Sequence, residues 1–424
     1  MKHITIHECY DKIYIKDSNE ENTITDSQAH ELDILVKNLN LNKDNIIWGR
    51  NYITFINYVG FIKLPSFSIE ILPKVGISDD EGDNDCSRKV LINMLSKSGK
   101  LDINYSELSV HKIFKKNIFE IFAYLFVIKL EKELRRGIQL EYVQKEENIY
   151  FQKGKILIKE QIQNKVKNNS KLYCCYEEFE SNNKLNMVFK NAIELLITKV
   201  KNIETVNKLK YCASYYSNLD KTFISNSDLD SFQFNRMNRR FEPAFYLAKM
   251  FLKSYSSTSA LASNKSFSLL FKMDELFEKY IAKVIKKNID QFVSIQDNRY
   301  KLLISEQTAN KSFPIKPDIV IEYEGEPKLI IDTKWKRISS SFHRHGMKRE
   351  DLYQMYAYLT RYENSTSAVL LYPHNSDISA GPGEVLESWV LENQINKRLR
   401  LYSIGLKNEN DTIEVLKKII NENI

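Results

Sequence analysis

The sequence has little of what usually marks disulfide frameworks and disordered tracts. Its 424 residues include only 12 glycines and 8 prolines, which argues against long disordered segments. The number of cysteines is odd, and none shows the Cys-x-x-Cys spacing: Cys9, Cys86, Cys174, Cys175 and Cys212. This pattern excludes a zinc motif and a disulfide framework and favours a reducing compartment.

Long apolar runs are also missing. The longest, Ile118 to Leu130, contains Glu120 and Lys129 and is too short to span a bilayer, so we expect a core helix and no membrane partner. The start of the sequence, residues 1–5, has no apolar signal-peptide core. The expected location is therefore the cytoplasm.

No phosphate-binding loop of the type Gly-x-x-x-x-Gly-Lys-(Ser/Thr) is present, so we expect no nucleotide hydrolysis by this chain. The 62 Lys and Arg against 55 Asp and Glu give a net charge of +7. That charge is low for a nucleic-acid-binding protein and is compatible with a partner that contributes further positive charge to binding. The length suggests two or three domains.

Two short β-branched runs form the most informative stretch. They are Lys316–Ile321 and Leu329–Lys334, and the polar link between them carries Gly325, which predicts a β-hairpin. Side chains alternate along a strand, so Asp332 and Lys334 are expected on one side, with Asp318 close by at the start of the preceding strand.

Two carboxylates and one amine at a strand end suit phosphodiester cleavage. Carboxylate oxygens hold a hard divalent cation, the cation polarises the phosphate, and an amine orients water or stabilises negative charge. Asp-x-Lys is a short pattern in a lysine-rich chain, and a solvated strand end is the alternative. Both acids adjoin apolar runs where an unpaired carboxylate is costly, which favours a site.

These residues carry a resemblance. Pro317-Asp318 followed by Asp332-Thr333-Lys334 resembles the PD-(D/E)xK nuclease motif. Residues 354–358, Gln-Met-Tyr-Ala-Tyr, resemble the Gln-x-x-x-Tyr signature of RecB-type nucleases. More narrowly, residues 351–358 and the run Gly60–Lys74, which ends Ile-x-Pro-Lys, resemble the McrC family, the nuclease subunit of McrBC modification-dependent restriction systems.

The resemblance implies roles for individual residues. Asp318 and Asp332 would bind Mg²⁺, Lys334 would position or activate the attacking water, and Gln354 with Tyr358 would shape the site. In nucleases of this kind an acid on the first helix often supplements the metal site. Glu278, in Leu-Phe-Glu, matches that pattern; Glu275 is the alternative, and a plain solvent-facing charge is another.

The resemblance also implies partners and a reaction. The chain would be the DNA endonuclease subunit of a McrBC-like system, cutting double-stranded, methylated DNA with Mg²⁺. A McrB-like AAA+ GTPase would drive it, so GTP would act only through that partner. Two other functions stay open: a stand-alone RecB-like repair nuclease, and a non-catalytic DNA-binding activator of a motor.

The expected fold class is mixed α/β with several domains. We expect a β-rich partner-docking region over 1–110, a mainly helical middle over 111–262, and a restriction-endonuclease-like domain over 263–424. The last boundary is placed in the serine-rich stretch 256–266. In the third region we expect helices at 273–289, around Gln354 and at 411–420, and strands at 300–306, 318–323, 329–335, 367–372 and 399–406.

Two basic clusters are candidates for DNA contact. One lies in the aperiodic region 337–349, which reads as a loop beside the site and supplies Arg337, Arg344, Lys348 and Arg349. The other, with flanking phenylalanines, comprises Arg236, Arg239 and Arg240. For both clusters the alternative is an ordinary solvated surface.

Overall fold

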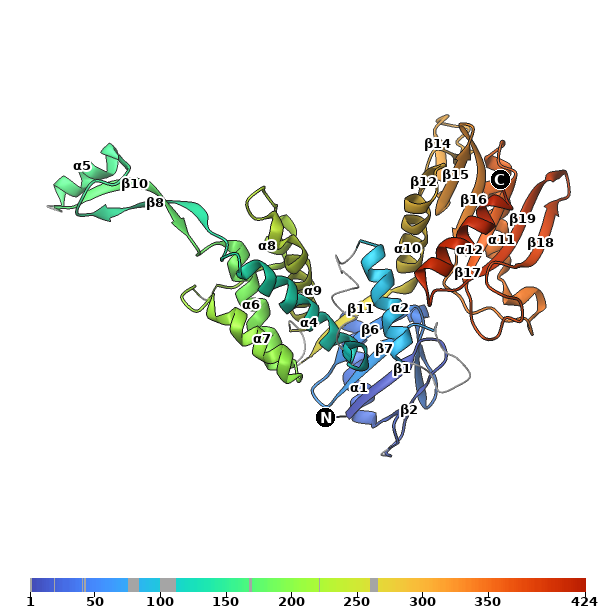
Figure 1. Cartoon of the computed structure of the whole chain (residues 1–424), viewed down its shortest axis with the longest axis horizontal. Helices are drawn as coiled ribbons and strands as arrows, with labels where there is room; N and C mark the ends of the chain where they lie inside the picture. Colours follow the sequence, from blue (N-terminus) through green and yellow to red (C-terminus); the bar gives the residue numbers. More distant parts are fainter. Residues whose placement is uncertain are drawn as a thin grey trace. The chain divides into compact units, whose positions relative to one another are not determined.

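The structure is a computed structural model that describes residues 2–18, 20–39, 41, 43–74, 84–99, 112–167, 170–220, 222–259 and 266–424. It divides into two compact units, one formed by Met1–Ile118 with Ser257–Ile424 and the other by Phe119–Ser256 (Figure 1). The fold is mixed α/β, with several sheets and 11 α-helices in the described ranges, which confirms the expected class.

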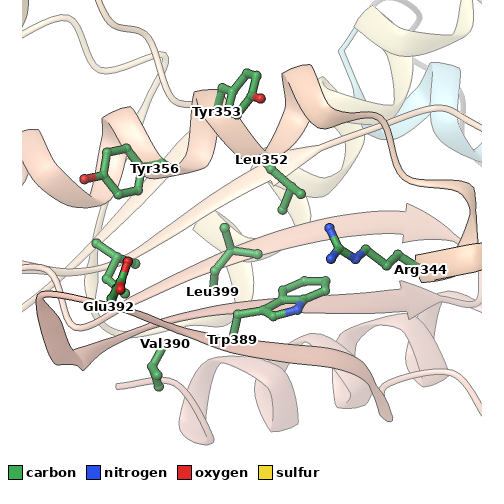
Figure 2. Close-up of a pocket in the computed structure, with 9 residues that line it drawn as sticks. Arg344, Leu352, Tyr353, Tyr356, Trp389, Val390, Glu392 and Leu399 are labelled. Carbon is green, nitrogen blue, oxygen red and sulfur yellow. The ribbon is translucent and has the colours of Figure 1, made fainter.

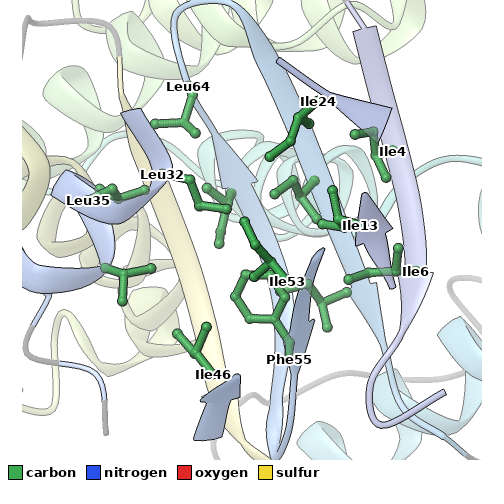
Figure 3. Packing of buried hydrophobic residues seen from close by; sticks show 14 of the residues in the cluster. Ile4, Ile6, Ile13, Ile24, Leu32, Leu35, Ile46, Ile53, Phe55 and Leu64 are labelled. Carbon is green, nitrogen blue, oxygen red and sulfur yellow. The ribbon is translucent and has the colours of Figure 1, made fainter. Parts of the chain in front are cut away.

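The N-terminal part of the first unit contains two four-stranded sheets. One has the order β1-β7-β6-β11 and the other the order β3-β2-β5-β4. Their apolar side chains, among them Ile4, Ile13, Ile53 and Phe55, form one buried core with helix α1 (Figure 3). The bounds are β1 Lys2–His7, β2 Ile13–Ile15, β3 Thr23–Ile24, α1 Asp26–Asn38, β4 Ile46–Trp48, β5 Tyr52–Phe55, β6 Tyr58–Lys63, β7 Phe67–Leu72, α2 Asn84–Lys97 and β11 Phe267–Lys272.

Strand β11 corrects the sequence-based assignment of residues 263–424 to one domain. It pairs antiparallel with β6, from Phe267 opposite Lys63 to Lys272 opposite Tyr58, and so belongs to the N-terminal sheet. A free edge of β6 would leave backbone groups unpaired, and β11 satisfies them. The predicted boundary itself, between 262 and 263, lies outside the described residues.

A six-stranded sheet forms the C-terminal part of the first unit, in the order β12-β15-β16-β17-β19-β18. Strands β16, β17 and β19 run parallel, and the other neighbours pair antiparallel. A separate hairpin, β13-β14, lies between β12 and β15 in sequence. The bounds are α10 Met273–Asn288, β12 Phe292–Ile295, β13 Lys301–Ile304, β14 Lys311–Pro314, β15 Ile319–Tyr323, β16 Glu326–Thr333, α11 Arg349–Arg361, β17 Ser367–Pro373, β18 Val385–Leu391, β19 Gln394–Ile404 and α12 Glu409–Asn421.

The sequence did not indicate strands β12, β14 and β18. All three are short or exposed: β12 and β18 are the edge strands of the large sheet, and β14 belongs to the two-stranded sheet. Such strands bury few side chains and therefore lack the apolar pattern of a central strand. By contrast, β15 and β17, which are mostly or fully buried, were expected within one residue of their bounds.

The second unit combines helices with a three-stranded sheet of order β8-β10-β9. Strands β8 and β10 extend away from helices α6–α9 and carry α5 at their far end (Figure 1). The predicted mainly helical middle missed this long pair of strands, because β8 is polar and largely exposed and β10 buries only two of its nine side chains. The bounds are α4 Ile118–Leu134, β8 Glu141–Ile149, β9 Lys155–Ile156, α5 Ile158–Val166, β10 Leu172–Glu180, α6 Lys184–Lys199, α7 Ile203–Ser214, α8 Asn226–Ser231 and α9 Glu242–Ser259.

Helix α9 also changes the expected linker, because it continues to Ser259 through residues that were predicted to be a loop. The rest of that linker, residues 260–265, lies outside the described part of the chain. Within the described ranges, none of the helices is long and apolar enough to cross a membrane.

Candidate active site

The β15–β16 hairpin brings the two predicted aspartates together. A two-residue turn, Glu324 and Gly325 with φ of 53° and 79°, joins the strands. Positive φ at both positions is typical of the type I′ turn, whose twist suits a hairpin. Ile319 pairs with Ile331, so Asp318 and Asp332 lie at the same end of the two strands.

Neither carboxylate is freely solvated. Oδ2 of Asp318 accepts hydrogen bonds from the backbone amide and the hydroxyl of Thr333, both at 2.7 Å. Asp332 is 1% exposed, and its Oδ2 lies 2.5 Å from Nζ of Lys334. The hairpin therefore holds both acids in fixed positions beside one ammonium group.

Burial makes the two carboxylates difficult to ionise together. It raises the pKa of Asp332 to about 7, and the charge of Asp318 adds to the effect. Burial, and then the charge of Glu278, raises the pKa of Asp318 to about 6. Clustered acids with raised pKa values are characteristic of functional sites, and a bound cation would relieve their repulsion.

Lys334 begins a chain of hydrogen bonds that ends on the backbone before Asp318. Its Nζ donates to Oε1 of Gln354 at 2.8 Å, and Nε2 of Gln354 donates to the hydroxyl of Tyr358 at 2.7 Å. That hydroxyl donates to the carbonyl of Lys316 at 3.0 Å. The chain fixes Lys334 from α11 and links three of the five residues predicted as catalytic, and the ion pair of Lys334 adds Asp332 as a fourth.

Asp351 is a member of the site that the sequence reasoning did not assign. It is 5% exposed, pairs with Lys336 at 2.7 Å and lies 3.9 Å from Nζ of Lys334. Its position three residues before Gln354 and seven before Tyr358 places all three on one face of α11, and this spacing was the available signal. An acid in the first turn of a helix also stabilises the helix dipole, so Asp351 could be explained in the sequence without a role in the site.

The surroundings of Glu278 and Glu275 show which of them lies nearer to the two aspartates. Glu278 on α10 is half-buried, accepts a hydrogen bond from Gln296 at 2.7 Å and contributes to the raised pKa of Asp318. Glu275, the alternative, is exposed and lies 3.6 Å from Lys272. Among the described residues, no three or more His, Cys, Asp or Glu side chains are arranged to hold a metal ion by themselves.

The basic residues predicted in region 337–349 are arranged in different ways. Arg337 pairs with Asp377 at 2.7 Å and lies 4.2 Å from the centre of the Tyr10 ring. Its guanidinium group is therefore already bound by side chains of this protein. Lys348 and Arg349 are exposed at the start of α11, the helix that carries Gln354. These two are therefore free to meet a ligand at that end of the site.

Arg344 lies in a separate groove of about 490 Å³ beside α11 (Figure 2). The groove is largely apolar, and Figure 2 shows the side chain of Arg344 alongside Trp389 and Leu352. None of the predicted catalytic side chains lines it.

The second predicted basic cluster belongs to the other unit. Arg240 donates to the carbonyl of Gly137 at 2.8 Å and lies over the ring of Phe241, which is a structural role within that unit. Arg239 pairs with Glu242 at 3.5 Å, and Arg236 is exposed.

Comparison with known proteins gives a family and a fold. A family described as McrBC 5-methylcytosine restriction system component matches residues 53–373. The fold is similar to a chain of the refined half-complex from the tetradecameric assembly of Thermococcus gammatolerans McrB AAA+ hexamers with bound McrC, with a TM-score of 0.75 and 18% identity over 98% of this chain and 100% of that chain.

A second similar structure is the cryo-EM structure of the Thermococcus gammatolerans McrBC complex. Its TM-score is 0.54 at 22% identity, over 68% of this chain and 89% of that chain. No curated protein matches the sequence.

Proposed function

The chain belongs to the family of McrBC 5-methylcytosine restriction system components, and from this premise we propose that it is the subunit that cuts DNA, through a PD-(D/E)xK domain. One observation carries the proposal: two aspartates with raised pKa values, Asp332 buried and Asp318 half-buried, share a strand end with Lys334. A merely structural hairpin gains nothing from two clustered acids, because each costs free energy when it ionises.

The two aspartates suit Mg²⁺. Both are oxygen donors, their mutual repulsion favours a cation, and Mg²⁺ usually binds through one or two carboxylates together with water and substrate phosphates. We therefore propose Asp318 and Asp332 as the protein ligands, with Glu278 as a nearby acid that adds negative charge. When bound, the ion would polarise the phosphate and lower the pKa of a water molecule.

Lys334 acts as a cation in this proposal. Burial works to lower its pKa, but the carboxylates of Asp332, Asp351 and Asp318 outweigh burial and raise it. The ammonium group therefore stays protonated, so it orients water or stabilises the negative charge of the phosphate and does not serve as a base. Gln354 and Tyr358 hold the ammonium in place from α11.

The DNA would approach the site from the side of Lys348 and Arg349. Both are exposed cations at the N-terminal end of α11, and phosphate contacts of this kind set the position of the duplex without reading its sequence. We propose double-stranded, methylated DNA as the substrate, on the strength of the family description.

A McrB-like AAA+ GTPase is the proposed partner, because both similar structures are described with McrB, or as the McrBC complex, and this chain belongs to the same family. The second unit offers a surface for such a partner. On α5 the side chains of Ile158, Ile162 and Val166 are 74%, 59% and 81% exposed, and their spacing of four residues places them in one stripe. An exposed apolar stripe of this kind marks an interaction site.

Plasmid cleavage tests the proposed function. The purified chain is incubated with Mg²⁺, with and without the AAA+ GTPase and GTP, on methylated and unmethylated DNA. Cleavage only when motor, GTP and methylation are all present supports the restriction subunit. Cleavage by the chain alone would instead favour a repair-type nuclease, and no cleavage under any condition would favour a non-catalytic activator.

A further inference from the structure

A buried carboxylate in the N-terminal sheet lies outside the site described above. Glu8 follows β1, and Lys74 lies two residues beyond β7, the parallel neighbour of β1, so both emerge from the same edge of the sheet. Glu8 is 0% exposed and Lys74 is 4% exposed. Burying a charged side chain costs free energy unless it is paired or hydrogen-bonded. The groups that Glu8 and Lys74 bond therefore indicate what the two residues do.

The partner of both residues is Trp335, the residue that follows Lys334. The indole Nε1 of Trp335 donates to Oε1 of Glu8 at 2.5 Å. Nζ of Lys74 donates to the backbone carbonyl of Trp335 at 3.2 Å and lies 5.0 Å from the centre of its ring. The N-terminal sheet thus fixes both the side chain and the backbone of Trp335.

Glu8 also reaches α10, the helix that carries Glu278. Its second oxygen accepts a hydrogen bond from the amide of Asn57 at 2.5 Å. Asn57 in turn accepts hydrogen bonds from the amides of Met273, at 3.0 Å, and Asp274, at 2.8 Å, at the start of α10. A single carboxylate therefore joins the segment beyond β16 and the first turn of α10.

Phe277 completes this arrangement. Its ring packs edge-on against Trp335 with centres 5.3 Å apart, and it directly precedes Glu278. Glu8 thus bonds Trp335, the sequence neighbour of Lys334, and Trp335 in turn contacts Phe277, the sequence neighbour of Glu278. Small displacements of such neighbours matter, because a shift of about 1 Å in a reacting group can cost about 100-fold in rate.

We propose that Glu8 and Lys74 are positioning residues for DNA cleavage, which hold Lys334 in place through Trp335. The N-terminal sheet then completes the active site, although it supplies no group that touches the substrate. This inference rests on the proposed nuclease function and adds two residues that lie more than 240 positions from Asp318 in the sequence.

The test is the single-turnover cleavage rate of the full-length chain with motor, GTP, methylated DNA and saturating Mg²⁺. Glu8→Ala and Lys74→Met are expected to lower the first-order rate constant about 10- to 100-fold, with the half-saturating DNA concentration unchanged. Glu8→Gln keeps an acceptor for the indole N–H and is expected to recover most of the rate. Partial unfolding alone would lower the amplitude of the reaction and leave its rate constant unchanged.

The matched control is Glu70→Ala. Glu70 is a buried carboxylate of the same sheet, but it pairs with Arg88 at 2.7 Å and accepts from the amide of Ile118. This variant is expected to lose stability and keep the rate constant. If Glu8→Ala does not fold, Trp335→Phe keeps an aromatic ring but removes the indole N–H that donates to Glu8, and it is expected to slow cleavage about tenfold.

Two results would overturn the inference, and they are distinguishable. If wild-type protein cleaves and the Glu8, Lys74 and Trp335 variants cleave with the same rate constant, the positioning role is wrong while the nuclease function stands. If wild-type protein does not cleave under any condition, the proposed function fails and the positioning role fails with it.

Discussion

The ammonium group of Lys334 lies 2.5 Å from Oδ2 of Asp332, and the same group donates to Gln354 at 2.8 Å. One cation thus links the acids of the hairpin to the helix that follows it. Because Asp332 and Asp318 both resist ionisation, this arrangement is electrostatically incomplete without a further positive charge.

Removing the charge of Asp332 should stabilise the metal-free protein. Its folded-state pKa is raised from 3.8 to about 7, so the native state binds the proton more tightly than the unfolded state. Stability from this group is therefore present at low pH and is lost as the pH rises from about 4 to about 7. The loss amounts to roughly 4 kcal/mol at most.

We accordingly expect Asp332→Asn to melt several degrees above the wild type at pH 8 without divalent ions, and the difference to shrink towards pH 5. Thermal unfolding monitored by circular dichroism measures it. Mg²⁺ should raise the midpoint of the wild type more than that of the variant. A variant less stable than the wild type at pH 8 would contradict the account.

The hydroxyl of Tyr358 should contribute to rate through Gln354. Tyr358→Phe removes the acceptor for Nε2 of Gln354 and the donor to the carbonyl of Lys316. Each hydrogen bond is worth about 1 kcal/mol, so we expect single-turnover cleavage to fall about 3- to 30-fold.

Tyr356→Phe is the matched control, because Tyr356 lies on the same helix and is 56% exposed. Its cleavage rate should equal that of the wild type. Equal losses in the two variants would show that the effect of Tyr358→Phe is a general effect on α11.

The apolar stripe on α5 should be needed for assembly with the motor. Ile162→Asp places a charge in the middle of the stripe, and we expect about 10- to 100-fold weaker binding to the AAA+ GTPase. Analytical size-exclusion chromatography and titration with labelled partner measure it. Gln163→Asp introduces the same charge at the adjacent, exposed position and should bind normally; equal weakening by both variants would mean that the stripe is not the contact.

The sequence predicted the hairpin well because its signals are local. Buried apolar residues fill the first three positions of β15 and the centre of β16, and the Glu324-Gly325 turn joins the strands, so the neighbouring residues alone determine this element. Because these signals are local, the sequence alone places Asp318, Asp332 and Lys334 at one strand end.

Other features depend on contacts that no local pattern encodes. The bond between Glu8 and Trp335 spans 327 positions, and β11 joins a sheet whose first strand, β1, begins about 265 residues earlier. Strand β8 is rich in charged residues and largely exposed, and β10 buries only two of its nine side chains, so neither shows the apolar alternation of a strand that faces a core. In the sequence Asp351 resembles an ordinary first-turn acid, and its contact with Lys336, which is fifteen positions away, is what distinguishes it.

The most direct measurement is cleavage of methylated plasmid by the complete system with Asp332→Ala in place of the wild-type chain. The account predicts a rate at least about 100-fold lower, with the GTPase partner still bound, because the variant lacks one proposed metal ligand and the charge that holds Lys334. Asp290→Ala, which changes an exposed aspartate, should cleave normally. Full activity of Asp332→Ala would contradict the assignment of the active site.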